Sequence, residues 1–184
     1  MRAKWIVGLA MLVSCATRAA ENVAVNASRV GDAVRITAQA TLKVPQQIVW
    51  QTLTDYERLP EFIPGMHKSE VIGHRGAAAI VTQLGEAHLL MFSYPIEVTV
   101  ASVHLPPYEI QIHLLEGNLK QLDGGYQIEP RPDGSLILHW TGLIEPSLTL
   151  PPLIREYLMR ATVEEQFLGM VREIERREGS RTLR

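Results

Sequence analysis

Most of the chain alternates between hydrophobic and polar residues with a period of two, the pattern of half-buried β-strands. The first long alternating segment begins at Val34 and ends at Leu42. From residue 66 to residue 146 the same alternation continues, interrupted only by short turn sequences. It predicts six further strands, near residues 67–74, 77–88, 90–105, 109–116, 119–130 and 135–144. The pattern therefore predicts a seven-stranded antiparallel sheet.

Three other segments follow a helical pattern. A short helix is expected after Pro45, because the apolar residues that follow repeat at helical spacing. A second short helical turn is expected just before Pro60. A long helix is expected from Pro152 to about Arg177, with two adjacent apolar stripes that form one wide face. Because such a face must be covered by the sheet, the predicted fold class is α+β, a curved seven-stranded sheet with two short helices and a long C-terminal helix.

The start of the chain differs from the rest. Arg2 and Lys4 precede an apolar stretch over residues 5–13, which is too short to span a bilayer but has the length of a secretory signal core. We therefore expect an exported, periplasmic protein. The expected division is a signal peptide over residues 1–20, a polar spacer over 21–31, one domain over 32–178 and a tail over 179–184.

Cys15 leaves two processing routes open. The sequence Leu12-Val13-Ser14-Cys15 resembles the lipobox of bacterial lipoproteins, in which the signal ends before the cysteine and the cysteine is lipidated. On that route Cys15 tethers the protein to a membrane, with the outer membrane as the expected destination. Small residues near Cys15 and Ala19 also fit ordinary signal peptidase, which would release a soluble protein. Because Cys15 is the single cysteine of the chain, the folded domain is expected to contain no disulfide and no thiol chemistry.

Composition excludes several classes of function. With 46% hydrophobic residues, the 184-residue chain can fill one core, and its net charge of −2 gives no indication of a nucleic-acid partner. The six histidines show no helical pair at a spacing of four and no carboxylate-rich metal motif. Serine and glycine show neither a nucleophile elbow nor a phosphate-binding loop. We therefore expect no metal, no cofactor and no assigned catalytic residue.

A cavity between the sheet and the long helix is the expected site, because strand parity places apolar residues on the face toward that helix. Tyr126 and Trp140 are favoured members, since each combines a large apolar surface with one hydrogen-bonding group, although plain core packing is the alternative for both. The small residues Gly142 and Ala161 are expected to leave space for a ligand. The expected ligand-binding residues are Phe62, Met66, Ile80, Ile96, Val98, Ile112, Tyr126, Leu138, Trp140, Leu158, Ala161 and Phe167.

The strand over residues 77–88 supplies possible polar groups for this cavity. Thr82, Glu86 and His88 share parity with Ile80 and Leu84, so all three face inward if the strand has no bulge. There they could orient a polar ligand head or act as acid and base. We favour the other interpretation, in which the strand leaves the sheet near Glu86 and both Glu86 and His88 are solvated, because a single-residue bulge reverses the parity.

The segment from Val49 to Val71, which contains Thr54-Asp55-Tyr56-Glu57-Arg58-Leu59-Pro60-Glu61-Phe62-Ile63-Pro64-Gly65, resembles the helix pair and loop of START-like proteins. These form the polyketide cyclase/dehydrase and coenzyme Q-binding superfamily (SRPBCC). Gly124-Gly125-Tyr126, the strand that reaches Trp140, and the entry into the last helix at Pro151-Pro152 are also similar to that group. The resemblance covers essentially the whole domain and implies a helix-grip fold.

The resemblance also implies a ligand class, since members bind lipids, quinones or polyketides, while a few act on RNA or ribosomes. The leader of this chain counts against a ribosomal partner. We therefore expect an exported domain that binds a lipophilic small molecule. A cyclase- or dehydratase-like enzyme that uses the same cavity and a protein-interaction module are the alternatives. Convergent acid and base groups inside the cavity would favour the enzyme, and a filled core with an exposed apolar patch would favour the module.

Overall fold

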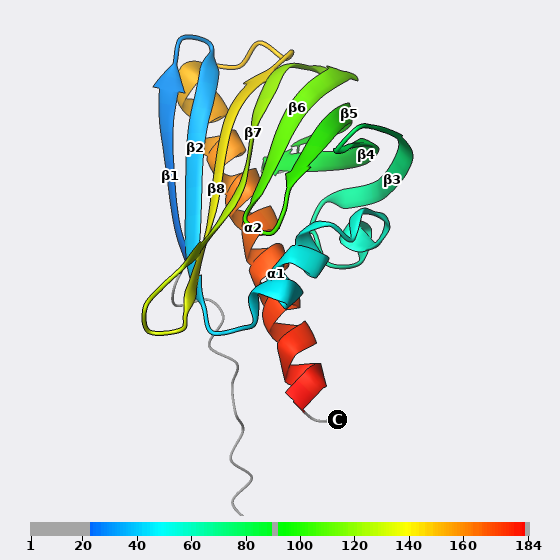
Figure 1. Ribbon diagram of the computed structural model, residues 1–184. Coiled ribbons are helices and arrows are strands. Elements are labelled where there is room, and N and C mark those ends of the chain that lie inside the picture. Colours follow the sequence, from blue (N-terminus) through cyan, green and yellow to red (C-terminus); the bar gives the residue numbers. More distant parts are fainter. Residues whose placement is uncertain (1–22, 90–91, 183–184) are drawn as a thin grey trace, which may run out of the picture.

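A computed structural model describes residues 23–89 and 92–182 as an antiparallel sheet curved around one long helix (Figure 1). The strands are β1 (Val23–Val30), β2 (Ala33–Leu42), β3 (Met66–Arg75), β4 (Ala78–Leu89), β5 (Phe92–Leu105), β6 (Glu109–Gly117), β7 (Leu119–Pro130) and β8 (Leu136–Pro146). The helices are α1 (Gln46–Leu53), the 3-10 helix η2 (Tyr56–Glu61) and α2 (Pro152–Thr182). The predicted helix-grip fold is confirmed, with eight strands in place of seven.

The additional strand is β1, which lies in the segment expected to be a spacer. It pairs antiparallel with β2, from Val23 opposite Ala40 to Val30 opposite Ala33. Its first residues alternate between half-buried and exposed, as in the other strands. The inward positions of β1 hold only valine and alanine, and several of the other positions are polar. The alternation of hydrophobic and polar residues is therefore weak, and the sequence does not predict this strand. At the other end of the chain, α2 continues to Thr182 and includes most of the expected tail.

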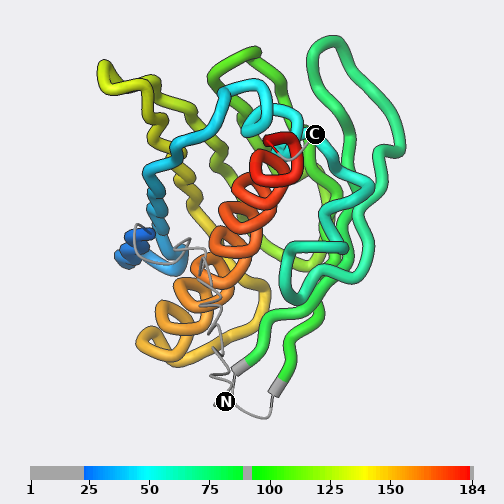
Figure 2. Tube along the Cα trace, turned by 90° about the horizontal axis from the view of Figure 1, so that it is seen from below, coloured from blue at the N-terminus to red at the C-terminus, as the bar shows by residue number. Residues whose placement is uncertain are grey.

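The cavity of this fold follows from the way in which α2 crosses the sheet. The strand order is β1-β2-β8-β7-β6-β5-β4-β3, and α2 packs mainly on β1, β2 and β4. These strands lie on the two sides of the sheet. Seen from below, the helix runs across the hollow of the curved sheet (Figure 2). Because a twisted sheet is concave, a helix supported on both sides leaves space above the central strands.

The buried core is divided into two clusters, one toward each end of α2. One contains Leu138 and Phe167 with residues of α1 and η2, and the other contains Val34, Val81 and Leu158. Four half-buried side chains pack against both clusters, and these are Val25, Tyr56, Ile112 and Trp140. The divided core therefore places large side chains around a space between its two halves.

The loop between η2 and β3 is fixed tightly to its neighbours. The Glu86 amide donates a hydrogen bond to the Gly65 carbonyl (2.8 Å). A Cβ atom on Gly85 would lie 2.5 Å from that same carbonyl oxygen, and one on Gly169 of α2 would lie 2.5 Å from the Phe62 carbonyl oxygen. Glycine is therefore required where this loop approaches both β4 and α2.

The expected signal peptide over residues 1–20, including Cys15, lies outside the described residues. Within residues 23–89 and 92–182, no helix is both long and apolar enough to cross a membrane.

Candidate ligand-binding site

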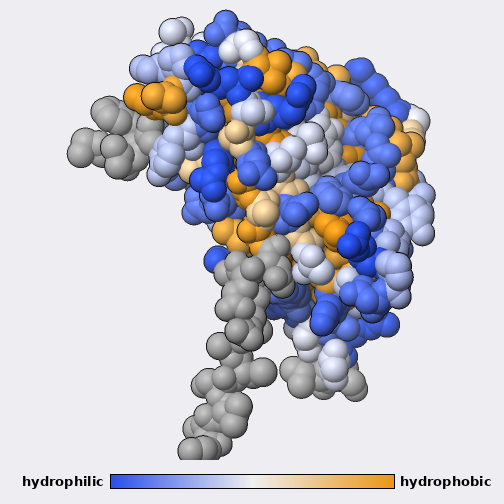
Figure 3. All heavy atoms as spheres, turned by 90° about the vertical axis from the view of Figure 1, so that its left-hand side faces the viewer, coloured by the Kyte–Doolittle hydropathy of each residue, from blue (hydrophilic) through white to orange (hydrophobic). Residues whose placement is uncertain are grey.

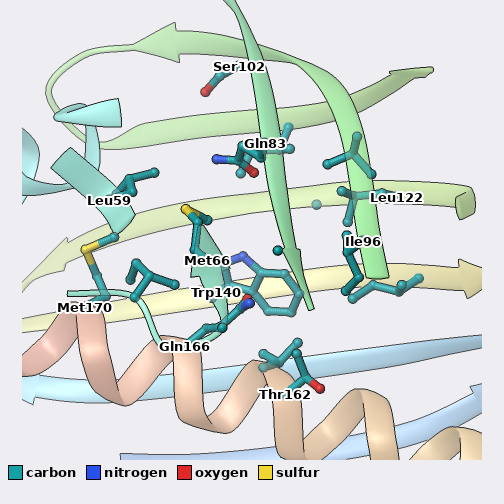
Figure 4. A pocket seen from close by; sticks show the side chains of 18 of the residues that line it. Leu59, Met66, Gln83, Ile96, Ser102, Leu122, Trp140, Thr162, Gln166 and Met170 are labelled. Carbon is teal, nitrogen blue, oxygen red and sulfur yellow. The ribbon is translucent and has the colours of Figure 1, made fainter. Parts of the chain in front are cut away.

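A partly enclosed cavity of about 190 Å³ lies between α2 and the central strands (Figure 4). This space is far larger than the roughly 10–15 Å³ that a single ordered water requires. Its lining is mainly aliphatic and aromatic, with residues from all three helices, the loop before β3 and the strands β3 to β8. In Figure 4, Thr162 and Gln166 on α2 lie across the open space from Gln83 and Ser102.

The helix contributes one complete face to the cavity. Its lining residues are Met159, Thr162, Val163, Gln166 and Met170. Their spacings of three, four, seven and eleven from Met159 place them on one side of α2. The expected helix residues do not line the cavity: Leu158 and Phe167 are buried in the core clusters, and Ala161 is half-buried. The space expected beside Ala161 is therefore one helical position away, next to Thr162 and Val163.

Six of the twelve expected apolar residues do line the cavity: Met66, Ile96, Val98, Ile112, Tyr126 and Trp140. Leu138 is fully buried in a core cluster, and Ile80 is buried outside both clusters. Phe62 is half-buried, and the guanidinium of Arg177 lies 5.5 Å from the centre of its ring. The parity of β5, β6 and the start of β8 was therefore predicted correctly, whereas several of the expected residues only fill the core.

The inward face expected for β4 was wrong along its first half. Ala79 and Val81 belong to a core cluster, so the odd-numbered residues face α2 there. Further along the strand, Leu84 and Glu86 also line the cavity. Gln83 shares their parity and lines the cavity. Thr82 is directed away from it, and its hydroxyl lies 3.1 Å from the Thr99 hydroxyl on β5.

Glu86 lines the rim of the cavity, yet its carboxylate is engaged at the surface. Its Oε1 lies 3.1 Å from Nε2 of His67 and 3.2 Å from Nε2 of His88. Both histidine side chains are more than half exposed. The structure thus has the solvated arrangement of Glu86 and His88 rather than an acid and base directed into the cavity.

The other polar groups of the cavity are uncharged, and sequence reasoning missed most of them. Gln83, Thr162 and Gln166 supply amide and hydroxyl groups from β4 and α2. The helical spacing of Thr162 and Gln166 with Met159 and Val163 was the signal that could have identified them. It was overlooked because only apolar stripes were considered as the inner face.

Tyr126 and Trp140 add two hydrogen-bond donors. Burial, with a smaller contribution from Tyr56, raises the pKa of the Tyr126 hydroxyl, so this group stays protonated at any physiological pH. Both side chains line the cavity. The Tyr126 hydroxyl and the Trp140 indole nitrogen can each donate a hydrogen bond to a polar atom of a ligand.

A hydrogen-bonded group of three side chains closes one end of the cavity. The Tyr56 hydroxyl lies 2.7 Å from Ser102 Oγ and 2.7 Å from His104 Nε2, and the Tyr56 and His104 rings are stacked. Burial raises the pKa of Tyr56, and burial together with the charge of His74 lowers the pKa of His104. Tyr56 and Ser102 line the cavity, while His104 stands behind Tyr56.

Metal chemistry has no candidate among the residues that the structure describes. No group of three or more His, Cys, Asp or Glu side chains in that part of the chain is arranged to hold a metal ion.

Solved structures with this fold include proteins of two kinds. One is a STAR-related lipid transfer protein from Xanthomonas axonopodis, with 12% identity and a TM-score of 0.66 over 85% of this chain and 95% of that chain. Another is the Zhui aromatase/cyclase from Streptomyces sp. R1128, with 15% identity and a TM-score of 0.66 over 82% of this chain and 96% of that chain. A START superfamily protein from Mycobacterium smegmatis is 14% identical, with a TM-score of 0.67 over 77% of this chain and 97% of that chain.

At such identities the structural likeness shows the fold alone. No curated protein matches the sequence. A family model does match residues 42–171, which form well over half of the chain. The protein therefore belongs to the family described as polyketide cyclase / dehydrase and lipid transport.

Proposed function

We propose that this protein is an exported binding protein that holds an uncharged lipophilic small molecule between α2 and the central strands, without transforming it. The observation that carries the proposal is the composition of the cavity wall. Aliphatic and aromatic side chains dominate it, and the polar groups that face inward are amides, hydroxyls and an indole nitrogen. An apolar guest gains favourable burial in such a space, and the few polar groups fix its orientation.

The same wall supports binding over catalysis. Its titratable side chains are Tyr56, Tyr126 and Glu86, and the carboxylate of Glu86 is paired with His67 and His88 at the rim. A cyclase or dehydratase that moves protons needs an acid and a base within reach of the substrate. The two tyrosines, with pKa values raised by burial, are poor bases. The presence of an open cavity likewise favours a small-molecule ligand over a protein partner.

The cavity can be tested by filling it from α2. Val163 lies on its lining, so Val163→Phe should occupy the space that a guest would use. We expect the variant to lose at least tenfold in affinity for the neutral fluorescent probe N-phenyl-1-naphthylamine, with little change in melting temperature. Leu153→Phe is the matched control, because Leu153 lies on the same helix and is 75% exposed.

A closely packed interior would respond differently. Overpacking would then destabilise Val163→Phe by roughly 1–3 kcal/mol, and the parent protein would bind no probe; that combination contradicts the proposal. Native mass spectrometry of the protein purified from its own cell envelope would identify the guest.

Export forms the second part of the proposal and is supported by the leader sequence. If Cys15 is lipidated, Cys15→Ser should move the protein from the membrane fraction to the soluble periplasmic fraction. Ser14→Ala keeps the cysteine and a small residue before it, and should leave the distribution unchanged. An identical distribution of parent and Cys15→Ser, with no lipid-sized mass on the native protein, would exclude the tether and leave ordinary signal cleavage.

A further inference from the structure

One end of the cavity contains a chain of hydrogen bonds through Ser102, Tyr56 and His104. Which groups donate and which accept depends on the protonation of His104, which lies outside the cavity lining. We propose that Tyr56 and Ser102 form a subsite for an uncharged oxygen group of the ligand, and that His104 sets whether this subsite prefers a hydroxyl or a carbonyl. The inference rests on the proposed ligand-binding function and adds the chemical class of the ligand's polar end.

The geometry links the three groups in series. Ser102 Oγ and His104 Nε2 each lie 2.7 Å from the same Tyr56 hydroxyl oxygen. Ser102 is almost fully buried and lines the cavity together with Tyr56. The His104 ring is held in place by the stacked Tyr56 ring (18° between planes, 5.8 Å between centres) and by the edge contact with Trp50 (80°, 5.9 Å). The chain therefore runs from a half-buried imidazole to two hydroxyl groups at the cavity wall.

Each hydroxyl has one proton, so a Tyr56 hydroxyl that donates to His104 can only accept from Ser102, whereas one that accepts from His104 has its proton available for Ser102. When His104 Nε2 carries no proton, Tyr56 donates to His104, and Ser102 donates to Tyr56. The lone pairs of Ser102 then face the cavity and accept a hydrogen bond from a ligand hydroxyl. When Nε2 carries a proton, His104 donates to Tyr56, and Tyr56 donates to Ser102. The Ser102 proton is then free, and it donates to a ligand carbonyl.

The surroundings of His104 make this a pH-dependent choice. The titratable groups near its ring are His74 on β3 and Tyr56 on η2. The other contacts are uncharged: Trp50 on α1, Ile110 opposite it on β6, and the Ala77 carbonyl, which accepts a hydrogen bond from the His104 amide. Burial and the charge of His74 lower the pKa of His104, so it is neutral at pH 7 and gains its proton in the acid range. Both ring nitrogens then carry protons, and the donating arrangement of Ser102 is fixed.

The lining also selects against a charged polar end. No lysine or arginine side chain belongs to the part of the cavity wall that the structure describes. A ligand carboxylate at Ser102 would lose its hydration without gaining a countercharge, which is unfavourable in an apolar space. A ketone, aldehyde or alcohol loses much less hydration free energy on entering the cavity, and it gains one hydrogen bond.

The test uses menthane, menthol and menthone, three molecules of one skeleton that carry no oxygen, a hydroxyl and a carbonyl. Each competes with N-phenyl-1-naphthylamine, which reports its affinity. At pH 7.5, we expect menthol and menthone to bind about three- to tenfold more tightly than menthane, the effect of one net hydrogen bond. Lowering the pH stepwise from 7.5 into the acid range, until His104 is protonated, should raise the affinity of menthone relative to menthol by several-fold.

Tyr56→Phe should remove the pH dependence of the menthone-to-menthol affinity ratio, because it breaks the link from His104 to Ser102, while menthane binds as before. Tyr94→Phe is the matched control, because the Tyr94 hydroxyl donates to the Asn118 carbonyl (3.0 Å) away from the cavity lining.

Equal affinities of the three molecules for the parent protein would overturn the proposed subsite and leave the proposed ligand-binding function intact. A preference that does not change with pH would overturn the role of His104. If neither the dye nor menthane binds, the proposed function fails and the subsite with it.

Discussion

The indole ring of Trp140 lies over Gly142, two residues further along β8. A Cβ atom on Gly142 would lie 2.7 Å from Cζ2 and 2.9 Å from Cζ3 of that ring. Residues two apart on a strand share a face, so the absence of a side chain at Gly142 provides the space into which the indole lies. The sequence predicted that this space would receive the ligand, whereas in the structure Trp140 occupies it and forms part of the cavity wall.

Gly142→Ala should therefore displace the indole. The ring is rigid and must rotate toward the cavity or push on its neighbours, so we expect a loss of roughly 1–3 kcal/mol in the free energy of unfolding. Binding of N-phenyl-1-naphthylamine should weaken in the same variant. Denaturant unfolding and probe titration measure the two effects. Gly73→Ala on β3 is the control, because a Cβ atom there meets no atom within 4 Å; equal behaviour of the two variants would contradict the contact.

A second prediction concerns the approach of the η2–β3 loop to α2. A Cβ atom on Gly169 would lie 2.5 Å from the Phe62 carbonyl oxygen and 2.7 Å from Pro64 Cδ. Gly169→Ala should lower the melting temperature, although alanine has the higher helix propensity by about 1 kcal/mol. Gly179 lies on the same helix with no atom within 4 Å of such a Cβ, so Gly179→Ala should leave stability unchanged or raise it. If both substitutions raise the melting temperature, the loop moves away from the new methyl group without a loss of stability, which contradicts the close contact.

Phe62 in the same loop and Met66, the first residue of β3, should separate stability from ligand release. Phe62 packs against a core cluster and beneath Arg177 without lining the cavity, whereas Met66 lines it. We expect Phe62→Ala to cost roughly 1–3 kcal/mol in stability, through lost burial and the lost cation–π contact, with little change in probe dissociation. Met66→Ala should mainly raise the dissociation rate in stopped-flow measurements. Faster release in Phe62→Ala alone would instead make Phe62 the gate.

The inward face of a strand can be predicted only where hydrophobic and polar residues alternate clearly along it. On β5, Ile96, Val98 and Val100 alternate with polar residues, so parity could be determined. On β4, residues of both parities are apolar from Ala78 to Val81, and the wrong set was chosen. A strand of this kind, buried partly on both faces, has no clear period of two, and its orientation is fixed by register with β5 and β3.

The polar part of the site was harder to predict than the apolar part. Ser102 and His104 follow Val100 at the same parity on β5, but nothing local indicates that Tyr56, 46 residues away from Ser102, meets both. That contact depends on how α1 and η2 fold back against the sheet. The cavity exists because α2 contacts strands on both sides of the sheet. These contacts depend on the strand order, which no single segment of the sequence predicts.

The last prediction concerns two glutamates of α2 that respond to pH in opposite ways. Glu173 is buried, and both its carboxylate oxygens accept hydrogen bonds, from Arg176 (2.6 and 2.8 Å) and Arg177 (2.7 Å). Arg177 also donates to Asp55 (2.7 Å), so the network ties α2 to the residue before η2. The bonds from Arg176 and Arg177 lower the pKa of Glu173, whereas burial raises the pKa of Glu175.

A lowered carboxyl pKa means that Glu173 stabilises the fold above its ordinary pKa of 4.5, and that this contribution is lost as the pH falls through the lowered value. Glu173→Gln should thus cost about 1–3 kcal/mol at pH 7 and progressively less as the pH falls below 4.5. For Glu175 the sign is reversed: the charged form is the disfavoured one, so Glu175→Gln should raise stability at pH 7, with the gain vanishing in acid. Urea unfolding of both variants from pH 7.5 to pH 3.5 measures these slopes. Parallel pH profiles for the two variants would contradict the opposite environments of these neighbouring side chains.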